Sequence, residues 1–198
     1  MKTTVYIKTY NAPEIDKKEV LRYAGAKGGD REILALLDRL IKESESSLSY
    51  KVCYSRFPIS VLGDSIDLGF AKASSHSLAL CLKDCCEVIV FCATVGVELD
   101  RLIRRYSLTS PSAATMLQAF GSERVEALCD AFCDDMAKET GKELRPRFSP
   151  GYGDLPLELQ KDIFTCLEPS KIGVALSENL FMTPSKSVTA IIGIKKEI

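Results

Sequence analysis

Six residues of the C-terminal half, Arg147-Phe-Ser-Pro-Gly-Tyr152, combine side-chain types that could hold a small zwitterionic ligand. Arg147 is a permanent cation whose guanidinium can grip a carboxylate through two parallel hydrogen bonds. Pro150 fixes the local backbone, and Gly151 lets a ligand approach without a Cβ in the way. The ring face of Tyr152 attracts cations by about 0.5 to 2 kcal/mol. Taken alone, a Pro-Gly-Tyr sequence is more often a turn packed by its tyrosine, and this interpretation stays open.

Two carboxylates upstream, Glu126 and Asp130, stand four residues apart in a stretch that favours a long helix. Residues at this spacing share one face of a helix, where like charges repel by about 0.2 to 0.5 kcal/mol. One of them could face the ammonium group of a ligand. Two solvated acids are an equally good interpretation.

The remaining reactive residues do not form a recognisable catalytic arrangement. The single histidine, His76, lies in a Ser-Ser-His-Ser segment at a predicted helix start, which favours a structural or solvent-facing role over catalysis. Among the eight cysteines, Cys129 and Cys133 are four residues apart, whereas zinc ribbons use a two-residue Cys-x-x-Cys spacing. We therefore predict buried thiols, no metal site and no catalytic nucleophile, with a thiol-based metal or redox module as a third possibility.

The charge and hydropathy of the chain narrow the class of partner. The 26 basic and 27 acidic residues nearly cancel and are scattered, so neither a nucleic acid nor a membrane is expected as a partner. The N-terminus has no signal-like apolar core, and the run from Val88 to Val97 is far shorter than the roughly 20 residues of a membrane-spanning helix. A cytoplasmic location with reduced thiols is expected.

Helix-capping residues and alternating patterns organise the N-terminal part. Asp16 and Asp30 are predicted N-caps of two helices. Alternating Tyr50, Val52 and Tyr54 predict a strand, followed by a ribbon that turns at Gly63-Asp64 and by a helix over about 75–82.

The continuous apolar run Val88–Cys92 predicts the central strand of the sheet, buried on both faces. A helix is expected over about 97–106. Ser110 and Pro111 then begin a long helix whose core-facing stripe includes Leu117, Gly121, Val125, Leu128, Phe132 and Met136.

A helix reaching Leu167 and two strands, around 172–176 and 187–194, complete the elements. We predict a single α+β domain with a mixed or antiparallel twisted sheet flanked by helices. Residues 1–70 supply N-terminal helices and a ribbon, and residues 71–198 form the core with the Arg147–Tyr152 loop.

Several spaced motifs resemble the C-terminal stretch of the activation domain of cobalamin-dependent methionine synthase. That family has Arg-x-x-Pro-Gly-Tyr, a proline four positions on, Leu-Thr-Glu, Met-x-Pro and Ser-Val in this order. The corresponding residues here are Arg147 to Tyr152, Pro156, Leu176-Ser-Glu178, Met182-Thr-Pro184 and Ser187-Val188. The resemblance is strong over 147–194, looser upstream, and limited to the gross pattern over 1–70.

The resemblance implies an S-adenosylmethionine site. Arg147 would meet the methionyl carboxylate, Gly151 and Tyr152 would lie near the nucleoside, and Glu126 or Asp130 would supply the carboxylate that the family takes from its long helix. The chain departs from the family in having no tryptophan and no acidic Trp-Phe-Phe segment at its start. The carboxylate which that segment provides is therefore unaccounted for in the sequence.

The resemblance further implies a role in reactivation, in which a corrinoid on a partner protein is reduced by one electron and methylated by S-adenosylmethionine. The implied partners are methionine synthase subunits or another corrinoid methyltransferase, with a flavodoxin or ferredoxin type electron donor. No general acid or base is needed for this step. The alternative is a non-catalytic scaffold that docks on a corrinoid protein without binding S-adenosylmethionine.

Overall fold

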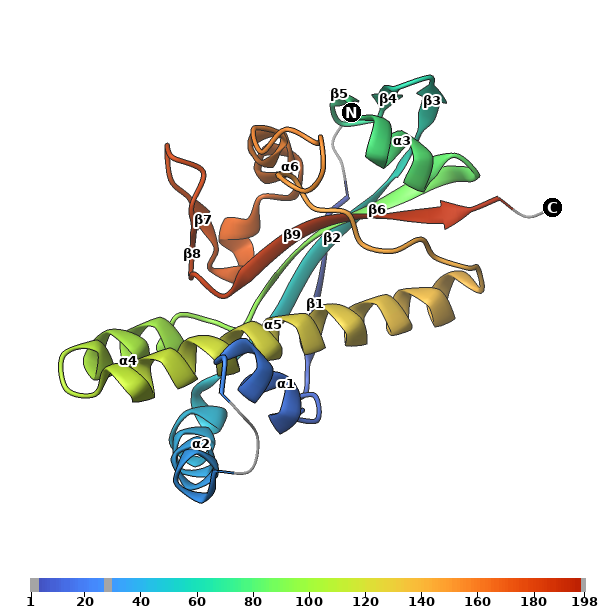
Figure 1. Cartoon of the computed structure of the whole chain (residues 1–198). Coiled ribbons are helices and arrows are strands. Elements are labelled where there is room, and N and C mark those ends of the chain that lie inside the picture. Colours follow the sequence, from blue (N-terminus) through green and yellow to red (C-terminus); the bar gives the residue numbers. More distant parts are fainter. Residues whose placement is uncertain (1–3, 27–29, 197–198) are drawn as a thin grey trace.

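A twisted antiparallel sheet lies at the centre of the computed structural model, which describes residues 4–26 and 30–196 (Figure 1). Its strands are β1 (Tyr6–Tyr10), β2 (Tyr50–Pro58), β6 (Cys85–Thr94) and β9 (Ser187–Lys195), hydrogen-bonded in that order. Each neighbouring pair is antiparallel. Helices flank the sheet, which confirms the predicted α+β class.

Strand β6 is buried on both faces, as its sequence predicts. Every residue from Val88 to Ala93 is fully inaccessible to solvent. Alternate side chains therefore enter two different cores: Phe91 belongs to the cluster under the long helix, and Cys92 belongs to the cluster on the opposite face. The same strand thus fixes which elements cover which side of the sheet.

One face of the sheet is covered by α5 (Pro111–Thr140), a helix of 30 residues. The helices α1 (Lys17–Tyr23), α2 (Arg31–Ser44) and α4 (Glu98–Ser107) share this core with it. The side chains of Asp16 and Asp30 accept backbone N–H bonds at the starts of α1 and α2, which confirms both predicted caps. Ser110 is at the N-cap of α5, but its hydroxyl contacts Ser112 and not a helix N–H.

The opposite face is covered by α3 (His76–Leu82), α6 (Leu159–Leu167) and the 3-10 turn η2 (Pro169–Ile172). A further 3-10 turn, η1 (Glu45–Ser47), leads into β2. The predicted ribbon is present as a small sheet whose strands are β3 (Ser60–Leu62), β4 (Ser65–Asp67) and β5 (Lys72–Ser74).

The strand expected around 172–176 is largely wrong. Ile172 ends the 3-10 turn η2, and Gly173 follows in the left-handed region with φ of 83°. Only Ala175–Leu176 is extended, as β7, and it pairs with β8 (Met182–Thr183) in a two-stranded hairpin. A left-handed residue cannot continue a strand, so the alternation of apolar residues there does not produce one.

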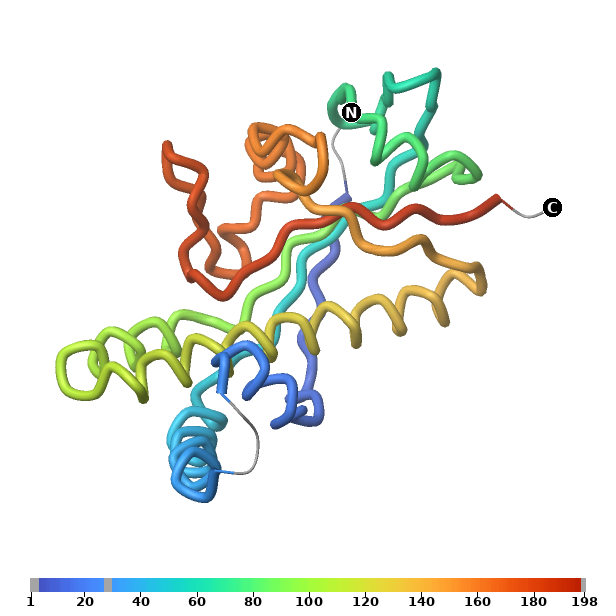
Figure 2. The backbone as a smooth tube through the Cα atoms, viewed as in Figure 1, coloured from blue at the N-terminus to red at the C-terminus, as the bar shows by residue number. Residues whose placement is uncertain are grey.

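After α5 the chain turns back and runs beside β9, as the tube in Figure 2 shows. The backbone N–H of Arg145 donates to the carbonyl of Gly193 at 2.8 Å, and Phe148 and Ile191 exchange two bonds of 2.9 Å. The first half of the Arg147–Tyr152 loop is thus held at an edge of the main sheet.

A buried ion pair ties the N-terminal segment to α5. Arg124 is fully buried and Glu123 is 4% exposed. The Arg124 guanidinium donates to Glu123 and to the carbonyls of Pro13 and Glu14, both at 2.6 Å. Glu123 also accepts the backbone N–H of Asp16 at 3.0 Å.

No helix within 4–26 or 30–196 is long and apolar enough to cross a membrane.

Replacing Arg124 by methionine should lower the free energy of unfolding by about 3 to 5 kcal/mol, because Glu123 would remain buried without its cation. Urea denaturation at neutral pH measures this loss. The matched control is Arg101→Met, which removes an exposed pair with Glu98 and should cost at most about 1 kcal/mol. Equal losses in the two variants would contradict a structural role for the buried pair.

Candidate functional site

Three of the residues predicted for the site come together around one guanidinium. Nη2 of Arg147 lies 2.8 Å from Oε2 of Glu126, and Nη1 lies 2.5 Å from Oδ1 of Asp130. Both acids project from the same face of α5, one helical turn apart, toward the edge segment that bears Arg147. We call these three residues the Arg147 triad. Their shared cation offsets the repulsion expected between two acids at this spacing.

The triad has two acidic side chains around one basic side chain. Partial burial lowers the pKa of Arg147, but the neighbouring Cys129 and Asp130 outweigh burial, and the net pKa lies above its usual value. Two carboxylates therefore surround one permanent cation. Cys133 lies beside it, with Sγ 3.9 Å from Nη1, and burial raises the pKa of this thiol so that it stays protonated at neutral pH.

Two cavities adjoin the triad and meet at Asp130. One, of about 660 Å³, lies between α5 and residues 142–147 and includes Cys133 and Arg147 in its lining. The other, of about 370 Å³, lies between α5 and the N-terminal segment. Its lining includes six carboxylate residues together with Tyr23 and Ala127: Glu14, Asp16, Glu19, Glu123, Glu126 and Asp130.

The start of the chain contributes carboxylates to this cavity, although it lacks the acidic Trp-Phe-Phe segment of the family. Glu14 and Asp16 reach the cavity because Arg124 binds the carbonyl of Glu14 and Glu123 accepts the backbone N–H of Asp16, which holds this segment against α5. In the sequence, Asp16 was recognised only as a helix N-cap. The sequence offered one signal for this acidic lining, which is the presence of three acids within six residues. Their contact with a helix more than 100 residues away is set by tertiary packing alone.

The second half of the Arg147–Tyr152 loop lies with a different core. The ring of Tyr152 packs edge-on against Phe148, with centroids 5.3 Å apart, and Phe148 belongs to the cluster under α3 and α6. Gly151 has φ of 84°, and its N–H donates to the carbonyl of Leu155 at 2.9 Å. This half, including Pro150, has the form of a turn packed by its tyrosine. Tyr152 is not among the residues that line the cavity beside Arg147.

The loop is anchored to α3 through Asp154. This carboxylate accepts bonds from the hydroxyl of Ser75 at 2.6 Å and from the N–H groups of His76 and Ser77 at 2.7 and 3.2 Å. The Ser75 hydroxyl, helped by these N–H groups, holds the pKa of Asp154 well below its usual range. The carboxylate therefore fixes both the start of α3 and the end of the loop.

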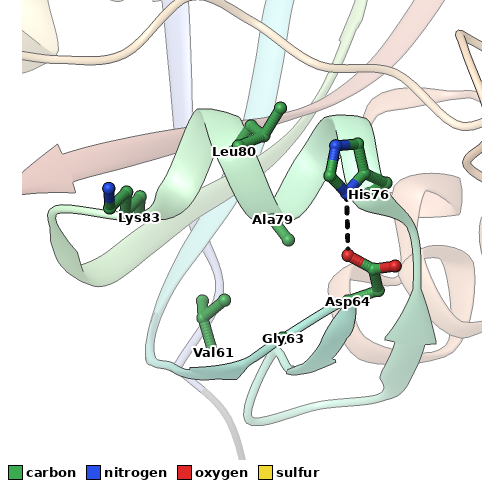
Figure 3. A pocket seen from close by; sticks show the side chains of 7 residues that line it. All are labelled: Val61, Gly63, Asp64, His76, Ala79, Leu80 and Lys83. Carbon is green, nitrogen blue, oxygen red and sulfur yellow. Dashed lines mark hydrogen bonds and ion pairs between the residues drawn. The ribbon is translucent and has the colours of Figure 1, made fainter.

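His76 lies at the rim of a hollow of about 330 Å³ between α3 and the β3–β4 turn (Figure 3). Its Nδ1 is 2.9 Å from Oδ1 of Asp64, and this hydrogen bond raises the pKa of the histidine. The close-up shows Val61 and Ala79 directed into the hollow, and Lys83 at its far end. The contact ties α3 to the small sheet, and both partners are exposed.

The eight cysteines are free, and four of them are buried: Cys53, Cys85, Cys92 and Cys129. Among residues 4–26 and 30–196, no group of three or more potential ligand side chains is arranged to hold a metal ion.

Comparison with known proteins identifies the fold. No protein-family model matches the sequence, and no curated protein matches it. A solved structure described as "Crystal Structure of the MetH Reactivation Domain bound to AdoHcy" is similar over 100% of this chain and 80% of its own, with a TM-score of 0.67 and 16% sequence identity. The chain thus has the fold of that domain. The resemblance predicted from the spaced motifs is confirmed at the level of the fold.

Replacing Asp154 by asparagine should change how stability depends on pH. Because its pKa is depressed in the folded state, the carboxylate contributes stability above its unfolded pKa of about 3.9, and this contribution is lost as the pH falls toward the folded pKa. Urea midpoints measured from about pH 7 to pH 2 should fall more steeply in the wild type than in Asp154→Asn. The control, Asp38→Asn, removes an exposed partner of Lys17. Parallel curves for wild type and Asp154→Asn would contradict the anchoring role.

Proposed function

We propose that this chain binds S-adenosylmethionine in the groove around the Arg147 triad and assists reductive methylation of a corrinoid held by a partner protein. The observation that carries this proposal is the junction of two cavities at Asp130, one of the two carboxylates that bracket the Arg147 guanidinium. The fold supports it, because the similar solved domain is a MetH reactivation domain described with AdoHcy bound.

The charges of the groove suit this ligand. S-adenosylmethionine has a carboxylate, an ammonium and a sulfonium group, which give it a single net positive charge. The triad has the opposite net charge, with two carboxylates around one guanidinium. Because a guanidinium has five N–H donors, Arg147 can donate hydrogen bonds to a ligand carboxylate while it retains its bonds to α5. Glu126, Asp130 and the acidic N-terminal lining would then face the cationic groups.

The proposed role of the protein is to orient its ligand. When bound, S-adenosylmethionine supplies the methyl group for a reduced corrinoid. The residues of the chain hold the carboxylate and ammonium ends, so that the sulfonium is presented in a fixed direction, and orientation provides the rate. The proposed reaction requires no general acid or base.

The partners in this proposal are methionine synthase subunits or another corrinoid methyltransferase, together with a flavodoxin or ferredoxin type electron donor. A cytoplasmic location belongs to the same proposal. The partners follow from the motif resemblance and the location from the hydropathy of the sequence, and the fold is compatible with both.

A scaffold that contacts a corrinoid protein without S-adenosylmethionine is the second candidate. One observation favours it: Arg147 is already paired internally, while Pro150, Gly151 and Tyr152 form a packed turn over a different core. In that case the triad would only fasten the edge segment to α5, and the ring of Tyr152 would only cover Phe148.

Titration calorimetry with S-adenosylmethionine separates the two functions. Replacing Arg147 by alanine should weaken binding by about 10- to 150-fold, because a charge-assisted bond contributes about 1.5 to 3 kcal/mol. The control, Arg101→Ala, removes an exposed arginine of α4 and should bind as the wild type does. No heat with the wild-type chain, alone and again with its corrinoid partner, would leave the scaffold as the function.

The variant Tyr152→Ala tests the predicted second half of the site. Its ring is 68% exposed, so one face is available to a ligand that reaches around the sheet edge. If the ring contacts the sulfonium nucleoside, its removal should weaken S-adenosylmethionine binding by about 2- to 30-fold, equivalent to about 0.5 to 2 kcal/mol. Unchanged affinity would limit the site to the α5 side. Leu157→Ala, which alters a neighbouring exposed apolar residue, is the control.

A further inference from the structure

Two cysteines that the proposed function does not use face each other in the middle of the main sheet. Cys53 of β2 and Cys92 of β6 are direct partners in the antiparallel register. Both are fully buried, and both point to the face covered by α6 and η2. The Arg147 triad lies on the α5 side, so this pair is a separate feature of the molecule.

The positions of the two residues suit a disulfide. Directly opposed residues of antiparallel strands have Cα atoms about 4.5 to 5.5 Å apart, which lies within the roughly 4.4 to 6.8 Å range of disulfides. The two thiols are also close enough to shift each other's pKa. The strand register therefore places the two residues within reach of a disulfide.

The two thiols differ in reactivity. The adjacent Cys92 thiol lowers the pKa of Cys53, and Lys171 adds to this effect. The adjacent Cys53 thiol, together with burial, raises the pKa of Cys92. Cys53 is therefore the first of the pair to become a thiolate, which is the form that attacks a disulfide.

We propose that Cys53 and Cys92 form a reversible cross-strand disulfide by exchange with small-molecule disulfides. The Cys53 thiolate attacks one sulfur of the small disulfide and releases the other half as a thiol. The sulfur of Cys92 then attacks the Cys53 side of the mixed disulfide and releases the second half. One disulfide is reduced to two thiols, which take up the two cysteine protons, and one disulfide is formed.

Access to the pair requires local opening. Ile163 and Leu167 of α6 and Ile172 of η2 belong to the same buried cluster as the two cysteines. An oxidant therefore reaches Cys53 only when α6 and η2 lift from the sheet, and exchange should be slow in the closed state. Urea below the unfolding transition should accelerate it, because urea favours such openings.

The test is incubation of the full chain with oxidised glutathione under native conditions, followed by intact-mass measurement and peptide mapping without reduction. We expect a loss of two hydrogen atoms, a peptide that joins Cys53 to Cys92, and full reversal by dithiothreitol. Cys53→Ser and Cys92→Ser should each abolish the linked species. Cys166→Ser, which removes another thiol packed against the same cluster, should retain it.

Three outcomes would overturn the proposal. These are an unchanged mass after incubation in sub-denaturing urea, glutathione adducts without an internal link, and a link that joins other cysteines. The wild-type peptide map decides among these outcomes even where a serine variant fails to fold, because it needs no substitution.

Discussion

Strand β6 is buried on both faces, so other elements of the chain must cover both sides of the sheet around it. Its continuous apolar sequence, from Val88 to Ala93, cannot remain in contact with water on either side. The long helix α5 covers one side, and α3 with α6 covers the other. The helices α1, α2 and α4 join the α5 side. The site residues are distributed accordingly.

The segment that follows α5 and runs beside β9 contains Arg147 and Phe148. It divides the predicted site between the two sides of the sheet. In an extended segment successive side chains point to opposite faces. Arg147 accordingly reaches α5, whereas Phe148 enters the core under α3 and α6 and receives the ring of Tyr152. The six contiguous residues of the motif are therefore two structural units. The first is an ionic contact with α5, and the second is a packed turn fastened to α3 by Asp154.

Patterns that depend on neighbouring residues predicted the structure well. The caps at Asp16 and Asp30, the strand at Val88–Cys92 and the long helix after Ser110 each follow from local chemistry and agree with the structure. The strand around 172–176 failed because the left-handed Gly173 interrupts an otherwise suitable alternation.

Local patterns also identified part of the candidate site, but they missed the part that depends on contacts between distant segments. Glu126 and Asp130 were identified from helical spacing, and the structure joins them to Arg147. The acidic lining from Glu14 was missed because it depends on the buried Arg124, whose guanidinium grips a backbone segment more than 100 residues away. A cation fully buried within a helix gives no periodic signal. Its partners become known only when the tertiary structure is known.

The charge balance on the α5 side decides which ligands suit the groove. A ligand with only anionic groups would gain one guanidinium but would meet Glu126 and Asp130 beside it, and the other four acids of the adjoining cavity would oppose it further. A ligand with only cationic groups would have to compete with Arg147 itself. A zwitterion with an excess of positive charge satisfies both conditions, because its carboxylate can bind Arg147 while its cationic groups neutralise the acids. The arrangement of charges, more than the identity of any one residue, therefore favours a zwitterion with an additional positive charge over a phosphate or a simple amine, and the proposed S-adenosylmethionine is a ligand of this kind.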